Sequence, residues 1–189
     1  MLRSQKDLIR RKANELVSKK PVFLDTETTG LGHRDEVIDI AVVGFDGEIL
    51  LKSLVRPIRP IPADATSVHG ITNKMVENAP EFGEIWTSLE SAITGKLVGI
   101  YNKDYDLRII KQSSGLNAFN PFLATAGSFC IIEMFARYYG QWDDYHQSYT
   151  WQKLSKAGMF LGITIPNTHR AVDDALLARQ VLLKMAGHN

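Results

Sequence analysis

The sequence contains little that would set it apart from ordinary globular proteins. Its 189 residues include one cysteine, Cys130, so no disulfide can form within the chain. No apolar run approaches the ~18 residues that span a membrane, and residues 1–20 lack the apolar core of a secretory signal. No internal repeat or low-complexity linker is evident. These absences argue against disulfide-rich secreted proteins and membrane proteins, and they favour a reducing, cytoplasmic setting.

The charge of the chain is nearly balanced but unevenly placed. The net charge is +1, yet residues 1–20 carry seven Lys and Arg against Asp7 and Glu15. A near-neutral total does not indicate a surface that attracts polyanions as a whole. Ile9, Ala13 and Leu16 follow helical spacing, which favours a solvated amphipathic helix, with phosphate contact as the alternative. We therefore expect a basic N-terminal helix in residues 1–20, appended to one domain in residues 21–189.

Apolar runs separated by turn residues predict an α/β domain. Strands are expected at 21–26, 36–44, 48–55 and 97–101, with a hairpin at Asp46-Gly47. Helices are expected at 72–78, 81–92, 104–112, 131–139, 150–159 and 170–185. Three prolines predict an irregular connection over residues 56–66. A strand meander followed by alternating strands and helices implies a mixed sheet flanked by helices.

Carboxylates interrupt the apolar pattern at several points. The strand period of two places Asp25 and Glu27 on one face of the first strand. Two neighbouring carboxylates repel each other, and burying them is costly unless a cation compensates. Hard divalent cations bind carboxylate oxygens, so the pair indicates a Mg²⁺ or Mn²⁺ site. A solvated strand end explains the spacing equally well.

The last predicted helix supplies a further inward acid. At about 100° per residue, Asp173 lies on the polar stripe, whereas Asp174 lies among apolar residues. The same reasoning places Asp106 between Ile109 and Ile110. A core-facing acid needs a partner, and a shared metal cluster would serve all of these acids. Buried salt bridges are the competing explanation, although the sequence reveals no core-facing lysine or arginine.

His169 immediately precedes the helix that carries Asp174. A lone histidine is more often a surface or capping residue than a catalyst. Its unperturbed pKa of ~6.5 nevertheless suits a general base near neutral pH.

These residues lie in segments that resemble the motifs of a known enzyme family. FLDTETTGL, YNKDYDLRII and HRAVDDALLARQ are similar, in that order, to the three motifs of the DEDDh (DnaQ-like) 3'–5' exonucleases. VHGIT, at 68–72, resembles a segment found between the first two motifs. The chain departs from the family pattern at Tyr105, where Phe is usual, and at Asp39, where Glu is common. The resemblance implies a ribonuclease H-like fold, in which three antiparallel strands precede parallel strands in a mixed sheet flanked by helices.

The resemblance also implies roles for individual residues. Two divalent cations, Mg²⁺ or Mn²⁺, would be held by four acids, with the first of them bridging both ions: Asp25, Glu27, Asp106 and Asp174. His169 would deprotonate the attacking water. Contacts to the terminal nucleotide are expected from a further set of residues: Thr28, Thr29, Leu31, His69, Asn102 and Tyr105. For Leu31 and His69, ordinary packing is the alternative explanation.

The expected activity is removal of nucleoside 5'-monophosphates from the 3' end of single-stranded DNA. Trimming of RNA 3' ends by an enzyme of the same family is the nearest alternative, because no residue reveals whether a 2'-hydroxyl fits. A non-catalytic subunit that binds nucleic acid or docks on a polymerase is the alternative from another class. The expected partners are a nucleic acid with a free 3' end, a polymerase or repair protein and another copy of the chain, but not a membrane.

A segment rich in aromatic residues stands apart from these motifs. Residues 138–151 include six aromatic side chains. They could stack on single-stranded bases, although packing within a loop or helix cap is slightly favoured.

Overall fold

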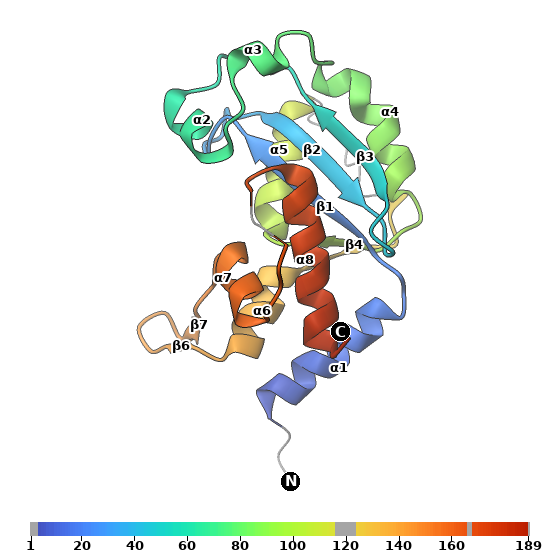
Figure 1. The fold of residues 1–189 in the computed structure, drawn as a ribbon, viewed down its shortest axis with the longest axis vertical. Helices are drawn as coiled ribbons and strands as arrows, with labels where there is room; N and C mark the ends of the chain where they lie inside the picture. The colour runs from blue at the N-terminus through green and yellow to red at the C-terminus, as the bar shows by residue number, and fades with distance from the viewer. Residues whose placement is uncertain (1–3, 116–123, 166–167, 189) are drawn as a thin grey trace.

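The fold is built on one mixed sheet. The computed structural model describes residues 4–115, 124–165 and 168–188 (Figure 1). Five strands lie in the order β3-β2-β1-β4-β5. Their bounds are β1 Val22–Thr28, β2 Val37–Val43, β3 Ile49–Leu54, β4 Val98–Ile100 and β5 Ser128–Cys130. β1 pairs antiparallel with β2 and parallel with β4, so the predicted ribonuclease H-like arrangement of antiparallel and then parallel strands is confirmed.

Helices cover both faces of this sheet (Figure 1). Their bounds are α1 Gln5–Val17, α2 Ala63–His69, α3 Asn73–Val76, α4 Phe82–Ile93, α5 Lys103–Ser113, α6 Ile131–Tyr139, α7 Leu154–Phe160 and α8 Ala171–Ala186. The alternation of side chains along β1 divides the core. Phe23 packs in a cluster with residues of α1, α6 and α8. Leu24 packs in another cluster with residues of α4 and α5.

The parallel strands end at one edge of the sheet, where the loop after β1, the segment leading to α5 and helix α6 begin. β1, β4 and β5 run in the same direction, so their carboxyl ends lie at the same edge. The chain enters α5 three residues after β4 ends, and it enters α6 directly after β5. Side chains from the end of β1 and the first turn of α5 are therefore brought together at this edge.

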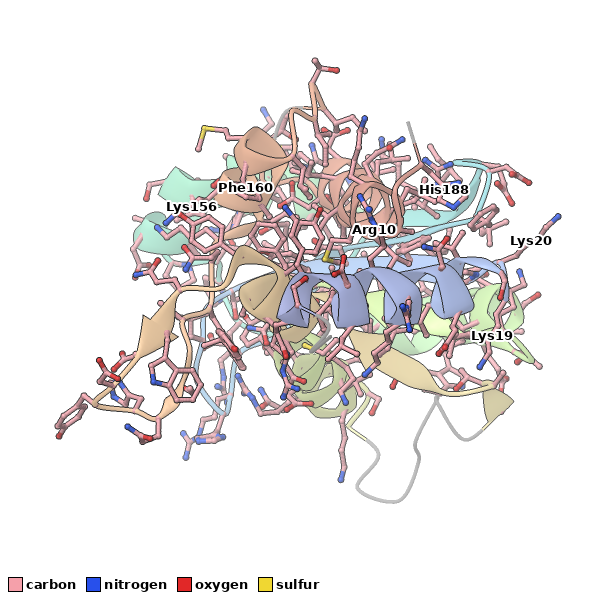
Figure 2. All side chains as sticks on the ribbon, turned by 90° about the horizontal axis from the view of Figure 1, so that it is seen from below. Arg10, Lys19, Lys20, Lys156, Phe160 and His188 are labelled. Carbon is pink, nitrogen blue, oxygen red and sulfur yellow. The ribbon has the colours of Figure 1, made fainter. Side chains whose placement is uncertain are left out.

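The N-terminal helix packs closely against the rest of the molecule. α1 contacts α8 and α6, and Ile9, Ala13 and Val17 are buried. The side-chain amide of Asn14 donates to the carbonyl of Ala186 at 2.7 Å. In Figure 2, α1 lies nearest the viewer, and Lys19, just beyond its end, is exposed.

Four parts of the fold differ from the sequence-based expectation, the first being β5, where no strand was expected. α2 begins at Ala63, inside the stretch 56–66 that was expected to be irregular. α7 begins at Leu154 instead of residue 150. A small hairpin, β6 (Trp142–Asp143) and β7 (Ser148–Tyr149), was not predicted because each of its strands has two residues. No helix among the described residues is long and apolar enough to cross a membrane.

Candidate active site

The end of β1 presents carboxylates on the face that α8 covers. Asp25 and Glu27 alternate with Thr26, as the strand period predicts. Thr26 points to the opposite face, where its hydroxyl donates to Oδ1 of Asp106 at 2.8 Å. Asp106 is buried in the first turn of α5. Two adjacent elements thus carry three acids to the same edge of the sheet.

The start of α8 contributes the fourth acid. Asp174 is buried, and its carboxylate lies in a compact group with Glu27 and His169. Each of these residues offers one potential ligand atom, and these atoms all lie within 4.8 Å of one another. The neighbouring Asp173 instead accepts a hydrogen bond from the hydroxyl of Thr168. The helix-face arithmetic therefore placed the two adjacent aspartates correctly.

The electrostatic environment of Asp25 links all four acids. Burial raises the pKa of Asp25 well above its usual value, and neighbouring carboxylates add to the effect. The three that add most are Asp106, Asp174 and Glu27. Carboxylates interact more strongly in a poorly solvated site than in water. The four predicted acids therefore lie within electrostatic reach of one another.

Two of the other acids also have raised pKa values. Burial, and then repulsion from Asp174, raises the pKa of Glu27 to about 8. Burial raises the pKa of Asp106 to about 7, although hydrogen bonds from Thr26 act in the opposite direction. The cluster therefore favours either bound protons or a bound cation near neutral pH.

One nearby acid has an arginine partner that the sequence did not reveal. Asp39 on β2 lies opposite Glu27 in the strand register. Its Oδ2 accepts a hydrogen bond from Nε of Arg170 at 2.8 Å. The sequence reveals no core-facing arginine, and Arg170, which is partly exposed, nevertheless reaches the buried Asp39.

A cleft of about 630 Å³ adjoins the acid cluster. Five of the six residues expected to contact substrate line this cleft: Thr28, Thr29, Leu31, His69 and Tyr105. Asn102 is not among the lining residues, and instead its backbone caps the start of α5. Ala65 and Val68 of α2 also line the cleft. They were missed because α2 itself was not predicted.

The hydroxyl of Tyr105, which lines the cleft, links two segments by hydrogen bonds. The hydroxyl of Tyr105 lies 2.6 Å from that of Thr28 and donates to the carbonyl of Gly30 at 2.9 Å. The phenylalanine that is usual at position 105 in the resembling family could not make these bonds. Tyr105 therefore ties the first turn of α5 to the chain that leaves β1.

Leu31 is exposed to solvent in the loop after β1, and hydrogen bonds constrain this loop. Leu31 is 80% exposed. Asp35 accepts hydrogen bonds from the Thr29 hydroxyl at 2.8 Å and the Gly32 amide at 2.6 Å. Arg108 donates to the carbonyl of Leu31 at 3.2 Å. An exposed leucine on a constrained loop suits contact with a base more than packing within the chain.

His69 has a defined hydrogen-bonding state. Its Nδ1 accepts a hydrogen bond from the amide of Ile71 at 3.0 Å. The neutral ring therefore carries its proton on Nε2, which has no hydrogen-bond partner among the described residues. Burial lowers the pKa of His69, which favours this neutral form. His69 is thus a buried, neutral ring in the wall of the cleft.

Comparison with known proteins identifies the family. The RNase_T exonuclease family model matches residues 22–182. The uncharacterized exonuclease CP81 of Escherichia phage 186 is 35% identical over 184 residues, and the match covers 94% of each chain. The chain belongs to the RNase_T exonuclease family, in line with its resemblance to the DEDDh 3'–5' exonucleases. DNA polymerase III subunit epsilon of Treponema pallidum is 28% identical over 171 residues, covering 87% of this exonuclease and 75% of that protein.

Solved structures support the fold of this exonuclease. The nuclease domain of 3'hExo, described as a DEDDh family member bound to rAMP, has a TM-score of 0.66 at 18% identity. The match covers 89% of this chain and 92% of that one. Exonuclease X in complex with 5' overhanging duplex DNA has a TM-score of 0.62 at 22% identity, with 89% and 93% covered.

The acid cluster of the exonuclease fits divalent cations. All four acids offer hard oxygen donors, which Mg²⁺ and Mn²⁺ prefer. Their raised pKa values arise from burial and mutual repulsion, both of which a bound cation would relieve. Of the predicted ligands, the geometry groups Glu27 and Asp174 with His169, whereas Asp25 and Asp106 stay predicted ligands.

Proposed function

We propose that this exonuclease hydrolyses the last phosphodiester bond of single-stranded DNA with the help of two divalent cations. The product would be a nucleoside 5'-monophosphate, together with a strand one nucleotide shorter. The main support is the convergence of four acids from three elements beside an open cleft. A site of this kind can hold cations and the phosphate of a chain end at the same time.

The four acids would hold the cations: Asp25, Glu27, Asp106 and Asp174. The electrostatic interaction of Asp25 with the other three acids supports a shared site. Bound cations supply charge stabilisation for the attacking and leaving oxygens of an in-line displacement. Thr26 keeps Asp106 oriented through its hydroxyl.

His169 would accept the proton of the attacking water. It is exposed at the start of α8, and a ring nitrogen lies in the compact group with Glu27 and Asp174. The water oxygen forms a bond to phosphorus while the bond from phosphorus to the 3' oxygen of the preceding nucleotide breaks. The proton from water passes to the ring nitrogen, and the released 3' oxygen takes a proton from solvent.

The cleft would select the chain end. Leu31 would contact the terminal base from its fixed loop, while Thr28 and Thr29 lie where β1 ends beside the acids. His69 would help to shape this cleft, which its buried ring lines. Asn102 and Tyr105 would act through the start of α5, where Tyr105 braces Thr28. Partnership with a polymerase and association of two copies stay predictions.

A digestion series tests this function. Single-stranded DNA, duplex DNA and RNA, each labelled at the 3' or the 5' end, would be incubated with Mg²⁺, Mn²⁺ or EDTA. We expect 5'-mononucleotides to leave single-stranded DNA from the 3' end, and EDTA to stop their release. Faster digestion of RNA would favour the RNA-trimming alternative. Binding without digestion would favour the non-catalytic alternative, and digestion that EDTA does not change would contradict the role of the acids.

A further inference from the structure

A second cleft, of about 550 Å³, lies between α6 and the β6–β7 hairpin. Trp142, Tyr149 and Trp151 line it together with Arg137 of α6. Trp142 is 47% exposed and Trp151 is 53% exposed. The aromatic residues of 138–151 therefore divide into two groups, because Tyr138 is buried in the core. We call this second site the aromatic cleft.

The hairpin that forms one wall of the aromatic cleft is internally braced. Asp143 accepts hydrogen bonds from the amides of Tyr145 and His146, at 2.9 Å and 3.0 Å. The rings of Trp142 and Tyr149 meet edge to face, with their centroids 5.1 Å apart. The two strands thus hold exposed aromatic faces in place without the support of the main sheet.

The base of the hairpin is fastened to the edge of the sheet that carries the acids. The buried Gln152 accepts a hydrogen bond at its carbonyl from the hydroxyl of Tyr101, at 2.7 Å. Tyr101 directly follows β4 and precedes Asn102, whose carbonyl receives the amide of Asp106. In Figure 1 the hairpin projects on the same side of the molecule as α2, which lines the first cleft. The base of the hairpin is therefore tied to the segment that leads from β4 into α5, which carries Asp106.

Basic residues gather beside the aromatic cleft, whereas within the cleft itself Arg137 is balanced by Glu133. Arg137 lines both the aromatic cleft and a neighbouring cleft that Lys12 and Lys103 line. Glu133 is the acid shared by the two clefts. Asp143 points its carboxylate at the amides of the hairpin tip. Cations beside exposed aromatic faces form the combination that binds single-stranded nucleic acid.

We propose that the aromatic cleft binds the single-stranded segment that precedes the 3' end held in the active site. Trp142 and Trp151 stack on bases, and Arg137 contacts the backbone phosphate. This inference rests on the proposed function, because it assigns the cleft to the same substrate. It predicts that the enzyme binds a long strand more tightly than a short one.

Kinetics on two substrates test the aromatic cleft. One substrate is a 20-nucleotide single strand, and the other is the nitrophenyl ester of thymidine 5'-monophosphate, which reaches only the active site. Trp142→Ala and Trp151→Ala should each raise KM for the long strand about 5- to 20-fold, with kcat and the rate on the ester unchanged. An unchanged KM, or an equal loss on both substrates, would overturn the proposal.

Tyr145→Ala is the matched control for these variants. Tyr145 belongs to the same hairpin and is 89% exposed, but it does not line the aromatic cleft. Its loss should leave both substrates unaffected. A rise in KM equal to that of the tryptophan variants would show a general effect of the hairpin and overturn the stacking assignment.

A binding experiment separates failure of this inference from failure of the proposed function. The inactive variant Asp174→Asn would be titrated in EDTA with oligothymidylate or oligouridylate while tryptophan fluorescence is followed. Quenching should occur and should disappear in the Trp142→Phe/Trp151→Phe double variant, which retains Trp86. The two oligonucleotides distinguish DNA from RNA as the occupant. Absence of quenching with both would overturn the inference, even if the wild-type enzyme digests DNA.

Discussion

Two adjacent aspartates at the start of α8 have opposite environments. Asp174 is buried beside Glu27 and His169, whereas Asp173 is partly exposed and accepts from Thr168. Both residues have the same chemistry and lie in the same helical turn. The two residues differ only in the direction of their side chains. Asp174 is a potential metal ligand, whereas Asp173 braces the start of the helix.

Asp174→Asn and Asp173→Asn form a matched pair of variants. Asp174→Asn should reduce kcat/KM at least about 100-fold, which corresponds to about 2.7 kcal/mol of lost transition-state stabilisation. Asp173→Asn should retain most of the activity, because the amide oxygen can still accept from Thr168. Initial rates on 3'-labelled single-stranded DNA measure both. Similar losses in the two variants would show that the helix-face assignment is wrong.

The ion pair of Asp39 and Arg170 supports the site from the second strand. Asp39 is 2% exposed, and its Oδ1 has no hydrogen-bond partner among the described residues. Arg170→Gln leaves this carboxylate buried without its cation, and should lower the free energy of unfolding by about 2–4 kcal/mol. Turnover should fall as well, because Arg170 adjoins His169.

A double-mutant cycle with Asp39→Asn isolates the interaction between these two residues. Urea unfolding in EDTA would give the free energy of unfolding for each variant. We expect a coupling energy of about 1–3 kcal/mol, because the two groups share a hydrogen bond. Independent effects of the two substitutions would show that the pair is not what stabilises the start of α8.

The site residues predicted correctly are those whose side-chain orientation follows from the period of their own strand or helix. The strand period identifies Asp25 and Glu27, and the helical period identifies Asp174. Arg170 escaped notice because it caps α8 and has no place in the helical pattern, while its partner lies 131 residues earlier. A charged residue inside the apolar run IDIAVV was the available signal for Asp39.

Among the helices and strands, the sequence pattern did not predict those that are short or that border on proline. Pro62 precedes α2 and is compatible with a helix start, so the helix begins just where a proline-rich stretch suggested irregular chain. Gly70 ends α2 with φ of 71°, a left-handed conformation that favours glycine. β5 has three residues, too few for a period of two to be distinguished from the start of a helix. Long elements with a clear apolar face were predicted close to their observed bounds, as α6 shows.

The packing of α1 leads to a prediction about the N-terminal segment. Ala13 is fully buried where α1 meets the core, whereas Arg11 is exposed on the same helix. Ala13→Leu should lower the free energy of unfolding by about 1–3 kcal/mol through overpacking. Arg11→Leu should change it by no more than about 0.5 kcal/mol. Urea unfolding monitored by circular dichroism measures both.

The stabilities of Ala13→Leu and Arg11→Leu test whether residues 1–20 are merely appended to the domain. If α1 only rested on the surface, the two leucine variants would have equal stability. A single cooperative transition that shifts in Ala13→Leu would show that α1 unfolds together with the sheet. Activity of the folded variant should be unchanged, because α1 lies far from α2 in Figure 1 and contributes no residue to the lining of the first cleft.

At the scale of the whole molecule, the acid cluster opposes folding unless its charge is compensated. The chain apart from residues 1–20 has more acidic than basic residues, and four acids crowd one edge of the sheet. Bound cations would offset both the local repulsion and the negative charge that a phosphate substrate brings. Stability and activity should therefore respond to the same ions.

The metal-free protein should become less stable as pH rises. Burial and repulsion raise the pKa of Glu27 to about 8 and that of Asp106 to about 7 in the folded chain. The unfolded chain releases these protons nearer pH 4. Between these values the folded state holds more protons, so the free energy of unfolding falls with pH by up to about 1.4 kcal/mol per unit for each proton. Urea unfolding in EDTA at pH 5 to 8 measures this slope.

Divalent cations should reverse that trend, because they bind the ionised carboxylates and stabilise the folded state. Mg²⁺ or Mn²⁺ should raise the free energy of unfolding more at pH 8 than at pH 5. In EDTA, Asp174→Asn should have a shallower slope than the wild type, since it removes a charge that raises the pKa of Glu27. Asp173→Asn should retain the wild-type slope. A cation effect equal at both pH values would mean that the ions bind away from the titrating acids.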